Sequence, residues 1–383
     1  MSRVKFGDVV KEIKISIDRD TDEHEYYVAG EHMETENLHI AQKGRFSDGY
    51  VGPAFIRLFK PGQILYGSRR TYLKKVAVAD FEGITSNTTF VLETKDENVF
   101  LQRLLPFIML TDDFTEFSIK KSRGSTNPYV LFSDLAEYEF NLPDINKQRE
   151  LADLLWAAYD TKTAYQDLII KTDELVKSQF IEMFADTPKG MIKDLCEIIM
   201  GQSPDGKTYN TDGKGMPFYQ GKTEFGDLYI GEPVTWTTAP TRIAEANDVL
   251  MSVRAPVGST NIATQKCCLG RGLAALRAIP EKSSAMFILY SMRSIERDIE
   301  NMGVGSTFKA INKEQVYKLP IPLADLTQQA RFVALAEQSD KSKFASSNRN
   351  LSRCLDISER TKRVGELLHL ESVASSILSG QKE

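Results

Sequence analysis

The sequence predicts an α+β protein with two similar mixed α/β domains, separated by two long antiparallel helices that form a coiled-coil spacer. Its 383 residues are enough for two ordinary domains, each able to bury its own core. Short segments of the first half recur in the same order in the second half, and each half ends in a long polar stretch with helical periodicity. Together these observations indicate a pseudo-twofold internal repeat.

The strongest internal match joins QILYGSR at residues 63–69 to DVLMSVR at residues 248–254. Further matches preserve the order along the chain: residues 27–30 with 219–221, 124–126 with 305–307, and 142–149 with 321–331. Each half begins with short β-rich runs between Gly, Pro and Asn, which is typical of a mixed globular domain. We therefore expect four segments, namely a first domain over residues 1–142, a central helical segment over 143–188, a second domain over 189–323, and a C-terminal helical segment over 324–383.

The central helical segment has the clearest periodicity in the chain. From Gln148 to about Phe184, apolar and small side chains step by three and four residues, and Pro188 follows. Such a helix is on the order of 55 Å long at 1.5 Å per residue, more than a compact domain requires. We expect it to pack antiparallel on a second, less regular helix from about Thr327 to Leu370.

Composition narrows the function classes. Apolar residues make up 42% and charged residues 26% of the chain, as in a folded protein. Neither a signal-peptide core nor an apolar run of about 18 residues is present, so we expect a cytoplasmic protein with no membrane partner. The four cysteines form no CxxC motif and there are only four histidines, so the sequence predicts neither structural zinc nor disulfides.

The segment GQSPDGKT at residues 201–208 spells the pattern of a phosphate-binding loop. Such a loop requires a helix after the Lys-Thr pair, because the helix N-terminus aims backbone amides at the phosphates. Here YNTDGKGMP follows, with two glycines and Pro217, and this stretch disfavours a helix. We interpret the segment as a turn-rich loop and keep a nucleotide-hydrolysing enzyme that uses Lys207 as an alternative function.

Other catalytic motifs are also incomplete. Asn127-Pro128-Tyr129 is one proline short of the motif that holds a flipped adenine in amino-methyltransferases, and no glycine-rich cofactor motif accompanies it. We interpret the tripeptide as a turn. With no nuclease carboxylate cluster and no Ser/His/Asp set, the chain is predicted to be non-catalytic, with no catalytic residue, metal or bound cofactor of its own.

Positive charge is concentrated at equivalent places in the two halves, although the net charge is −5. Residues 49–79 contain no carboxylate and six Lys or Arg, and residues 249–280 contain no carboxylate and four Lys or Arg. Ordinary strands with solvated basic edges would explain one such window. Recurrence in both halves favours contact with a polyanion, in which Lys and Arg bind phosphates while neighbouring polar side chains read base edges. Two readers on one face of a duplex are then about 34 Å or a multiple of it apart, a separation that the helices could fix.

These segments resemble the DNA-specificity subunit of type I restriction-modification systems. The resemblance covers nearly the whole second half through IMGQSPDGKTYN, GMPFYQGKTEFG, NDVLMSVRAPVGSTNIA, LGRGLAAL, GVGSTFKAIN and LPIPLADLTQQARF. The first half is similar more loosely, through GQILYGSRR, SRGSTNPYVL and LPDINKQREL, and lacks the GQSP segment.

The resemblance implies two target-recognition domains, each reading one half of a bipartite, asymmetric site in double-stranded DNA. It also implies methyltransferase subunits docked on the long helices and restriction-translocase subunits in the same assembly. S-adenosylmethionine, ATP and magnesium would belong to those partners. A purely structural helical adaptor without DNA contact remains the other alternative.

The candidate DNA-binding residues follow from the basic windows and the motifs that carry the resemblance. In the first domain they are Ser68, Arg69, Arg70, Lys74 and Arg123, and in the second domain Tyr219, Gln220, Lys222, Arg254, Arg271 and Lys309.

Overall fold

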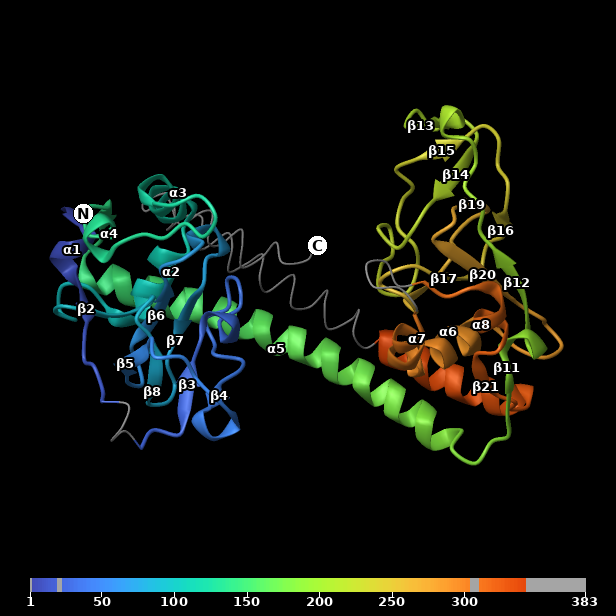
Figure 1. Ribbon diagram of the computed structural model, residues 1–383, viewed down its shortest axis with the longest axis horizontal. Helices are drawn as coiled ribbons and strands as arrows, with labels where there is room; N and C mark the ends of the chain where they lie inside the picture. The colour runs from blue at the N-terminus through green and yellow to red at the C-terminus, as the bar shows by residue number, and fades with distance from the viewer. Residues whose placement is uncertain (1, 19–22, 304–309, 342–383) are drawn as a thin grey trace. The chain divides into compact units, whose positions relative to one another are not determined.

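The computed structural model describes residues 2–18, 23–303 and 310–341 (Figure 1). The chain divides into two compact units, and the boundary lies between Gln166 and Asp167, inside the long helix α5 (Ile145–Met183). Each unit has its own hydrophobic core. The predicted mixed α/β class with a long helix is thus confirmed.

The first unit contains two four-stranded sheets and a separate strand pair. The first sheet has the order β2-β9-β6-β7 and is antiparallel throughout. The second has the order β4-β3-β8-β5, in which β3 and β8 run parallel and the other pairs antiparallel. The strands are β1 (Ser2–Lys5), which pairs with β10 (Glu139–Leu142), and β2 (Val10–Ile13), β3 (Tyr26–Val28), β4 (Gly44–Arg45), β5 (Phe55–Phe59), β6 (Ile64–Gly67), β7 (Val76–Val78), β8 (Gly83–Ser86) and β9 (Thr89–Thr94).

The second unit has a closely matching strand order. Its antiparallel sheet is β12-β20-β17-β18, and its mixed sheet is β13-β15-β14-β19-β16, in which β14 and β19 run parallel. The strands are β11 (Lys189–Met191), which pairs with β21 (Pro320–Pro322), and β12 (Cys196–Met200), β13 (Tyr209–Asn210), β14 (Met216–Tyr219), β15 (Trp236–Thr237), β16 (Ile243–Ala244), β17 (Val249–Ser252), β18 (Thr260–Ile262), β19 (Cys267–Leu269) and β20 (Leu273–Ala278). The structure therefore adds β13 at the edge of the second unit's mixed sheet.

Strand alternation explains how each antiparallel sheet separates two cores. Along β6, Ile64 and Tyr66 join the core on the helical side, whereas Leu65 packs between the two sheets. Along β17, Val249 and Met251 face the helices, and Leu250 faces the mixed sheet. Both runs are apolar at successive positions, which is typical of a strand buried on both faces.

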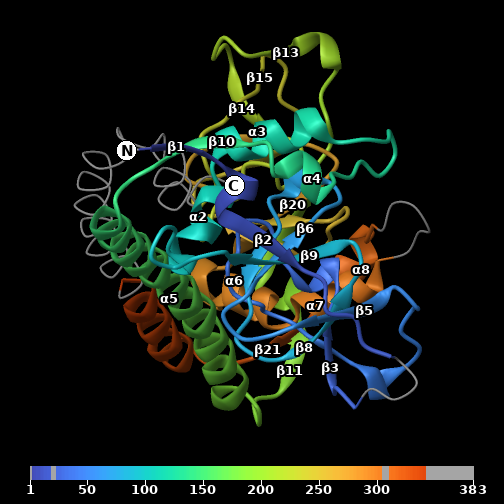
Figure 2. The ribbon, with the colours of Figure 1, turned by 90° about the vertical axis from the view of Figure 1, so that its left-hand side faces the viewer.

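The remaining helices cover one side of each antiparallel sheet. In the first unit α3 and α4 lie side by side at one end (Figures 1 and 2). In the second unit β13 and β15 form the tip farthest from α6 to α8 (Figures 1 and 2). The helices are α1 (Phe6–Val9), α2 (Leu105–Met109), α3 (Asp112–Lys121), α4 (Phe132–Leu135), α6 (Ala285–Ser294), α7 (Glu296–Met302), α8 (Lys313–Tyr317) and residues 326–341. Over the described residues, none of the helices combines the length and apolar character that a membrane span needs.

The long helix begins where the sequence can cap it. The carboxylate of Asp144 accepts hydrogen bonds from the amides of Asn146 and Lys147, both at 3.1 Å. Leu151 and Leu155 join the core of the first unit, and Val176 and Phe180 join that of the second. The predicted antiparallel pairing of two long helices involves residues 342–383, which lie outside the described residues.

Candidate nucleic-acid interface

In the second unit, the turn between β19 and β20 carries Arg271 between two glycines. A Cβ atom on Gly270 would lie 2.7 Å from the Cα of Gln220, and one on Gly272 would lie 2.4 Å from the Gln220 carbonyl oxygen. Both glycines are therefore needed for the close approach of this turn to the end of β14. The amide of Gly270 donates to the Tyr219 carbonyl oxygen at 2.8 Å, which fixes the turn against that strand.

Two further segments hold the same turn. The amide of Val253 donates to the Gly272 carbonyl oxygen at 2.9 Å, so Arg254 lies directly beside the turn. The hydroxyl of Ser203 accepts a hydrogen bond from the Arg271 amide at 3.2 Å. The structure thus brings together Gln220, Arg254 and Arg271, which come from three separate segments.

The first unit builds an equivalent turn between β8 and β9. The Ser68 amide and hydroxyl both donate to the Thr88 carbonyl oxygen, at 3.2 and 2.6 Å. Strand pairing sets the equivalence, because Gly67 opposes Thr89 as Ser252 opposes Leu273. Arg69 lies two residues after Gly67, and Arg254 lies two residues after Ser252, so the two arginines are at equivalent positions.

The same counting identifies a residue that the sequence analysis missed. Asn87 takes the place of Arg271, and its side chain is exposed. The number of residues that separates matching positions in the two halves changes along the chain. The residues beside Asn87 and Arg271 also differ, so only the strand register gives this equivalence.

A short hairpin completes the first turn. Arg123 and Tyr129 exchange backbone hydrogen bonds of 2.8 and 2.9 Å, and Gly124 adopts the positive φ of +90° that the hairpin needs. Tyr129 also opposes Arg69 in an antiparallel bridge. Directly opposed residues place their side chains on one face, so Arg69, Tyr129 and Arg123 share a face.

The second unit has the same bridge with a smaller residue. There Arg254 opposes Ala310. The neighbouring backbone bonds match as well, because Val130 donates to the Ser68 carbonyl oxygen at 2.9 Å and Ile311 to the Val253 carbonyl oxygen at 3.0 Å. The exposed ring of Tyr129 in the first unit is thus replaced by a methyl group in the second.

Five of the predicted basic residues present free positive charge. Each is exposed, and within residues 2–18, 23–303 and 310–341 no carboxylate lies at ion-pair distance from any of them. They are Arg69, Arg70, Lys222, Arg254 and Arg271. Gln220 is exposed as well. An unpaired surface cation can accept a phosphate without first breaking an ion pair, which favours these residues as contacts with a polyanion.

Three predicted residues do not fit direct contact. Ser68 is buried and holds the turn, and Tyr219 is fully buried with its hydroxyl donating to the Gly231 carbonyl oxygen at 2.9 Å. The ammonium of Lys74 bonds the carboxylates of Glu36 at 3.0 Å and Asp112 at 2.7 Å. Burial alone would lower the pKa of Lys74, but these two hydrogen bonds outweigh it and raise the pKa above its usual value. We therefore revise these expectations, since burial or ion pairing already occupies the side chains.

Two predicted residues remain. Arg123 is exposed, but its guanidinium bonds Asp134 at 2.9 Å, so part of its charge is neutralised. Lys309 lies outside the described residues.

The loop at residues 201–208 has the geometry of a turn. Residues Gly206–Thr208 form one 3-10 turn, and strand β13 follows at once. The prediction that no helix follows the Lys-Thr pair is confirmed, and the amide of Lys207 donates to Asp205 at 3.0 Å. A carboxylate at this amide occupies a donor that a phosphate would need, so the loop does not fit a nucleotide.

The three cysteines of the described residues are buried. Burial raises the pKa of the Cys196 and Cys267 thiols to about 12, so neither forms a thiolate nucleophile at neutral pH. Both are free thiols, as is Cys268. Across the described ranges, no three His, Cys, Asp or Glu residues are grouped so that they could hold a metal ion.

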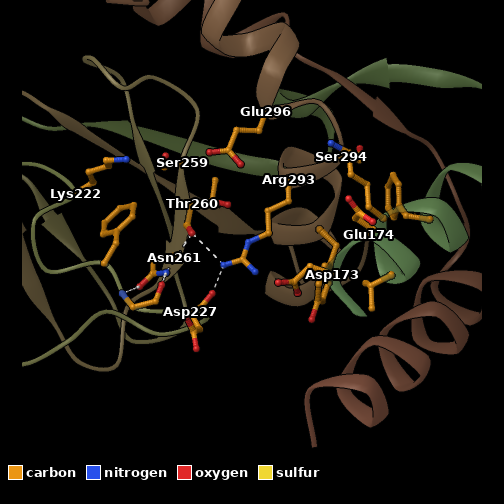
Figure 3. Close-up of a pocket in the computed structure, with 16 residues that line it drawn as sticks. Asp173, Glu174, Lys222, Asp227, Ser259, Thr260, Asn261, Arg293, Ser294 and Glu296 are labelled. Carbon is orange, nitrogen blue, oxygen red and sulfur yellow. Dashed lines mark hydrogen bonds between the residues drawn. The ribbon is translucent and has the colours of Figure 1, made fainter. Parts of the chain in front are cut away.

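A cleft of about 570 Å³ in the second unit is a separate feature (Figure 3). Arg293 points to the carbonyl oxygens of Asp227 and Thr260, so it ties the loop after β14 to β18 (Figure 3). The side chains of Asp173, Glu174, Asp227 and Glu296 line the cleft alongside Lys177 and Lys222. Four carboxylates disfavour a polyanion, so the turns are the better interface.

Comparison with known proteins agrees with these features. The family model for the type I restriction modification DNA specificity domain matches residues 11–170 and 188–352. The putative type I restriction enzyme MjaX specificity subunit of Methanocaldococcus jannaschii is 47% identical over 133 residues, which are 35% of this chain and 31% of that protein. The EcoDI specificity subunit of Escherichia coli is 28% identical over 130 residues, 33% of this chain and 28% of that protein. The matched region is thus about a third of these curated relatives.

Solved structures match along nearly the whole chain. A chain solved in work on complex assembly and conformational transition of the type I R-M system has a TM-score of 0.54 and 27% identity, covering 99% of this chain and 96% of that one. The type I restriction-modification S subunit of M. genitalium has a TM-score of 0.61 at 14% identity, covering 97% and 95%, and supports the fold alone. Since the family model matches most of the sequence in two blocks, the chain belongs to the type I restriction modification DNA specificity domain family.

Proposed function

We propose that this chain is the non-catalytic DNA-recognition subunit of a type I restriction-modification assembly, in which each unit reads one half of a bipartite site. One observation carries the proposal. Both units place an exposed arginine, Arg69 or Arg254, beside the turn that joins the unit's mixed sheet to its antiparallel sheet, and no carboxylate of the described chain pairs with either one. Equivalent free cations in two similar folds are suited to the phosphate backbone, which is the same in both half-sites.

The turn residues complete each reading surface. Arg70 in the first unit, and Gln220 and Arg271 in the second, are exposed around the turns, and Lys222 is exposed two residues after Gln220, where it lines the cleft. Arg and Gln can donate to base edges in the major groove, whereas Lys contributes mainly charge.

The wider architecture follows from the same proposal. We divide the chain into recognition domains at residues 1–142 and 189–323 and helical segments at 143–188 and 324–383, with an internal repeat and a helical spacer. The shared strand orders and the 39-residue helix α5 support this division.

The partners are assigned on the same basis. Methyltransferase subunits would dock on the helical segments and restriction-translocase subunits would join them in the cytoplasm, where the DNA lies. S-adenosylmethionine, ATP and magnesium would be bound by those subunits.

The test is to map methylated adenines in DNA from cells with and without the chain. A bipartite motif that depends on the chain is expected, and its absence from cells that contain the partner subunits would contradict the proposal. Arg69→Ala and Arg254→Ala should each reduce methylation at that motif. Arg3→Ala is the matched control, because Arg3 is an exposed arginine that bonds Glu139 at 2.8 Å and lies on β1, in a strand pair separate from the two sheets that the turn joins. Hydrolysis of ATP by the purified chain, lost in Lys207→Ala, would favour an enzyme instead.

A further inference from the structure

The two recognition turns share one framework but carry different side chains at one position. Backbone pairing makes Asn87 of the first unit equivalent to Arg271 of the second. Each residue lies in the turn that joins a strand of the mixed sheet's parallel pair to an inner strand of the antiparallel sheet. These strands are β8 and β9 in the first unit, and β19 and β20 in the second. The equivalence therefore rests on strand register, not on sequence likeness.

Both side chains are available for contact. Asn87 and Arg271 are exposed, and their backbone amides are used inside the fold, where Asn87 donates to the Ala54 carbonyl oxygen at 2.8 Å and Arg271 to Ser203. The turns are thus fixed by backbone contacts, and the side chains are not needed to hold them. A rigid backbone with a free side chain is what a specificity position requires.

Around each turn, one position carries the same residue in both units and another carries different residues. Arg69 and Arg254 are the same residue beside both turns, which suits contact with phosphates, since phosphates carry no sequence information. Asn87 and Arg271 differ, which suits contact with bases in a site whose two halves differ. The two side chains also have different preferred bases, because an amide pairs with adenine N6 and N7 and a guanidinium pairs with guanine O6 and N7.

We propose that Asn87 and Arg271 are equivalent specificity residues, and that Asn87 selects an adenine in one half-site while Arg271 selects a guanine in the other. This inference rests on the proposed function. A good bidentate contact discriminates by about 5- to 150-fold in affinity, so a change at either position alters one base of one half-site and leaves the other half-site as it was.

The test uses the full chain with its methyltransferase subunits in a selection from randomised duplexes, followed by sequencing. The wild-type complex should enrich one bipartite motif. Asn87→Arg should change one base of the first half-site from adenine to guanine, and Arg271→Asn should change one base of the second from guanine to adenine. Competition between single-base variants of the motif gives relative affinities, which do not depend on the fraction of folded protein.

Alanine variants separate base reading from general affinity. Asn87→Ala and Arg271→Ala should reduce the preference at the same single base by about 5- to 150-fold while the other bases keep theirs. Unchanged motifs in both exchanges, or an equal loss of affinity for every duplex, would overturn the inference while the proposed function stands. Failure of the wild-type complex to enrich any motif would overturn the proposed function itself.

Discussion

The two units have equivalent strands but join them by different side-chain contacts. Gln63 and Glu93 are cross-strand neighbours in the first unit, and the Gln63 amide donates to Glu93 at 2.8 Å. Asp248 and Arg277 occupy the equivalent places in the second unit, where the guanidinium donates to both carboxylate oxygens at 3.0 and 2.7 Å. Donor and acceptor have exchanged strands, and the acceptor in the second unit is a carboxylate that is only 4% exposed.

A second buried contact is retained in both units. Gln148 and Gln329 lie near the starts of α5 and of the helix at residues 326–341, at 0% and 2% exposure. Each side-chain amide donates to two backbone carbonyl oxygens, and each carbonyl accepts one hydrogen bond. The comparison indicates that the helix attachment is constrained, whereas the strand contact can vary when both partners change together.

The largest effect is expected at the retained glutamines. Gln148→Leu leaves the Leu101 amide and two carbonyl oxygens without partners. One of the three lost hydrogen bonds is buried and two are partly buried, so together their loss should lower the free energy of unfolding of the first unit by about 3 kcal/mol. Gln329→Leu should cost about 2 kcal/mol, because one of its partners is a Ser283 hydroxyl that can turn to another acceptor. Gln166→Leu, at an exposed position of α5, is the control.

The chain offers a separate optical probe for each unit. Its two tryptophans are Trp156 in the first unit and Trp236 in the second, so each Trp→Phe background leaves one reporter for urea unfolding. Gln148→Leu should shift the Trp156 transition, and Gln329→Leu the Trp236 transition. Equal stability of Gln148→Leu and Gln166→Leu would show that the buried glutamine does not anchor the helix.

The exchanged strand contact should give the next largest difference. Arg277→Met leaves the Asp248 carboxylate buried without its cation, and because Arg277 is about one third exposed we expect a loss of about 2–3 kcal/mol in the second unit. Glu93→Gln keeps an amide acceptor for Gln63 and removes only the partly exposed ion pair with Lys11 at 3.2 Å, so the first unit should lose about 1 kcal/mol or less. Urea unfolding with the two tryptophan reporters measures both, and equal losses would contradict the distinction.

The sequence predicts the elements that depend on local pattern. The heptad stripe and Pro188 located α5 to within a few residues. The helix begins at Ile145, before Gln148, because Asp144 caps it there, and it ends at Met183, one residue before Phe184. The absence of a helix after residue 208 followed from its glycines and Pro217 in the same way.

Contacts between distant segments could not be predicted. Lys74 looked like a free basic residue because its partners, Glu36 and Asp112, each lie 38 positions away. Tyr219 is the last residue of β14 and Gln220 follows it. The burial of Tyr219 depends on the pairing of β14 with β19, which the sequence does not show. Asn87 was missed because its match to Arg271 exists in strand register alone.

The glycines of the second turn provide a sharper test of the shared framework. In Gly270→Ala the new Cβ would lie 2.7 Å from the Gln220 Cα, so the turn or β14 must shift, and we expect a loss of about 1–2 kcal/mol in the second unit. Ser86, the equivalent residue of the first unit, already has a side chain, and its hydroxyl accepts a hydrogen bond from the Thr88 amide at 3.3 Å. Ser86→Ala therefore creates no steric clash and should cost only the loss of the hydroxyl's contacts with Thr88, about 0.5–1 kcal/mol. Urea unfolding followed by Trp236 fluorescence measures the change. An unaltered midpoint of the unfolding transition would mean that this contact does not fix the turn.

The smallest effect is expected where the two units differ at the surface. Tyr129 presents its ring on the face shared with Arg69, whereas Ala310 presents only a methyl group beside Arg254. If the turns bind DNA as proposed, Tyr129→Ala should weaken binding to the first half-site by about 1 kcal/mol, roughly fivefold, through lost contact area. Tyr129→Phe keeps the ring and should bind nearly as the wild type does.

Ala310→Tyr is the reciprocal change and tests whether the face itself is in contact. A ring added beside Arg254 must alter binding to the second half-site, either by new contact with the duplex or by steric exclusion from it. Fluorescence anisotropy with duplexes in which one half-site is scrambled separates the two units, and the salt dependence should stay the same because no charge changes. Binding that is unaffected by both Tyr129→Ala and Ala310→Tyr would place this face away from the duplex, and the interface would then be limited to Arg69, Arg254 and the turn residues next to them.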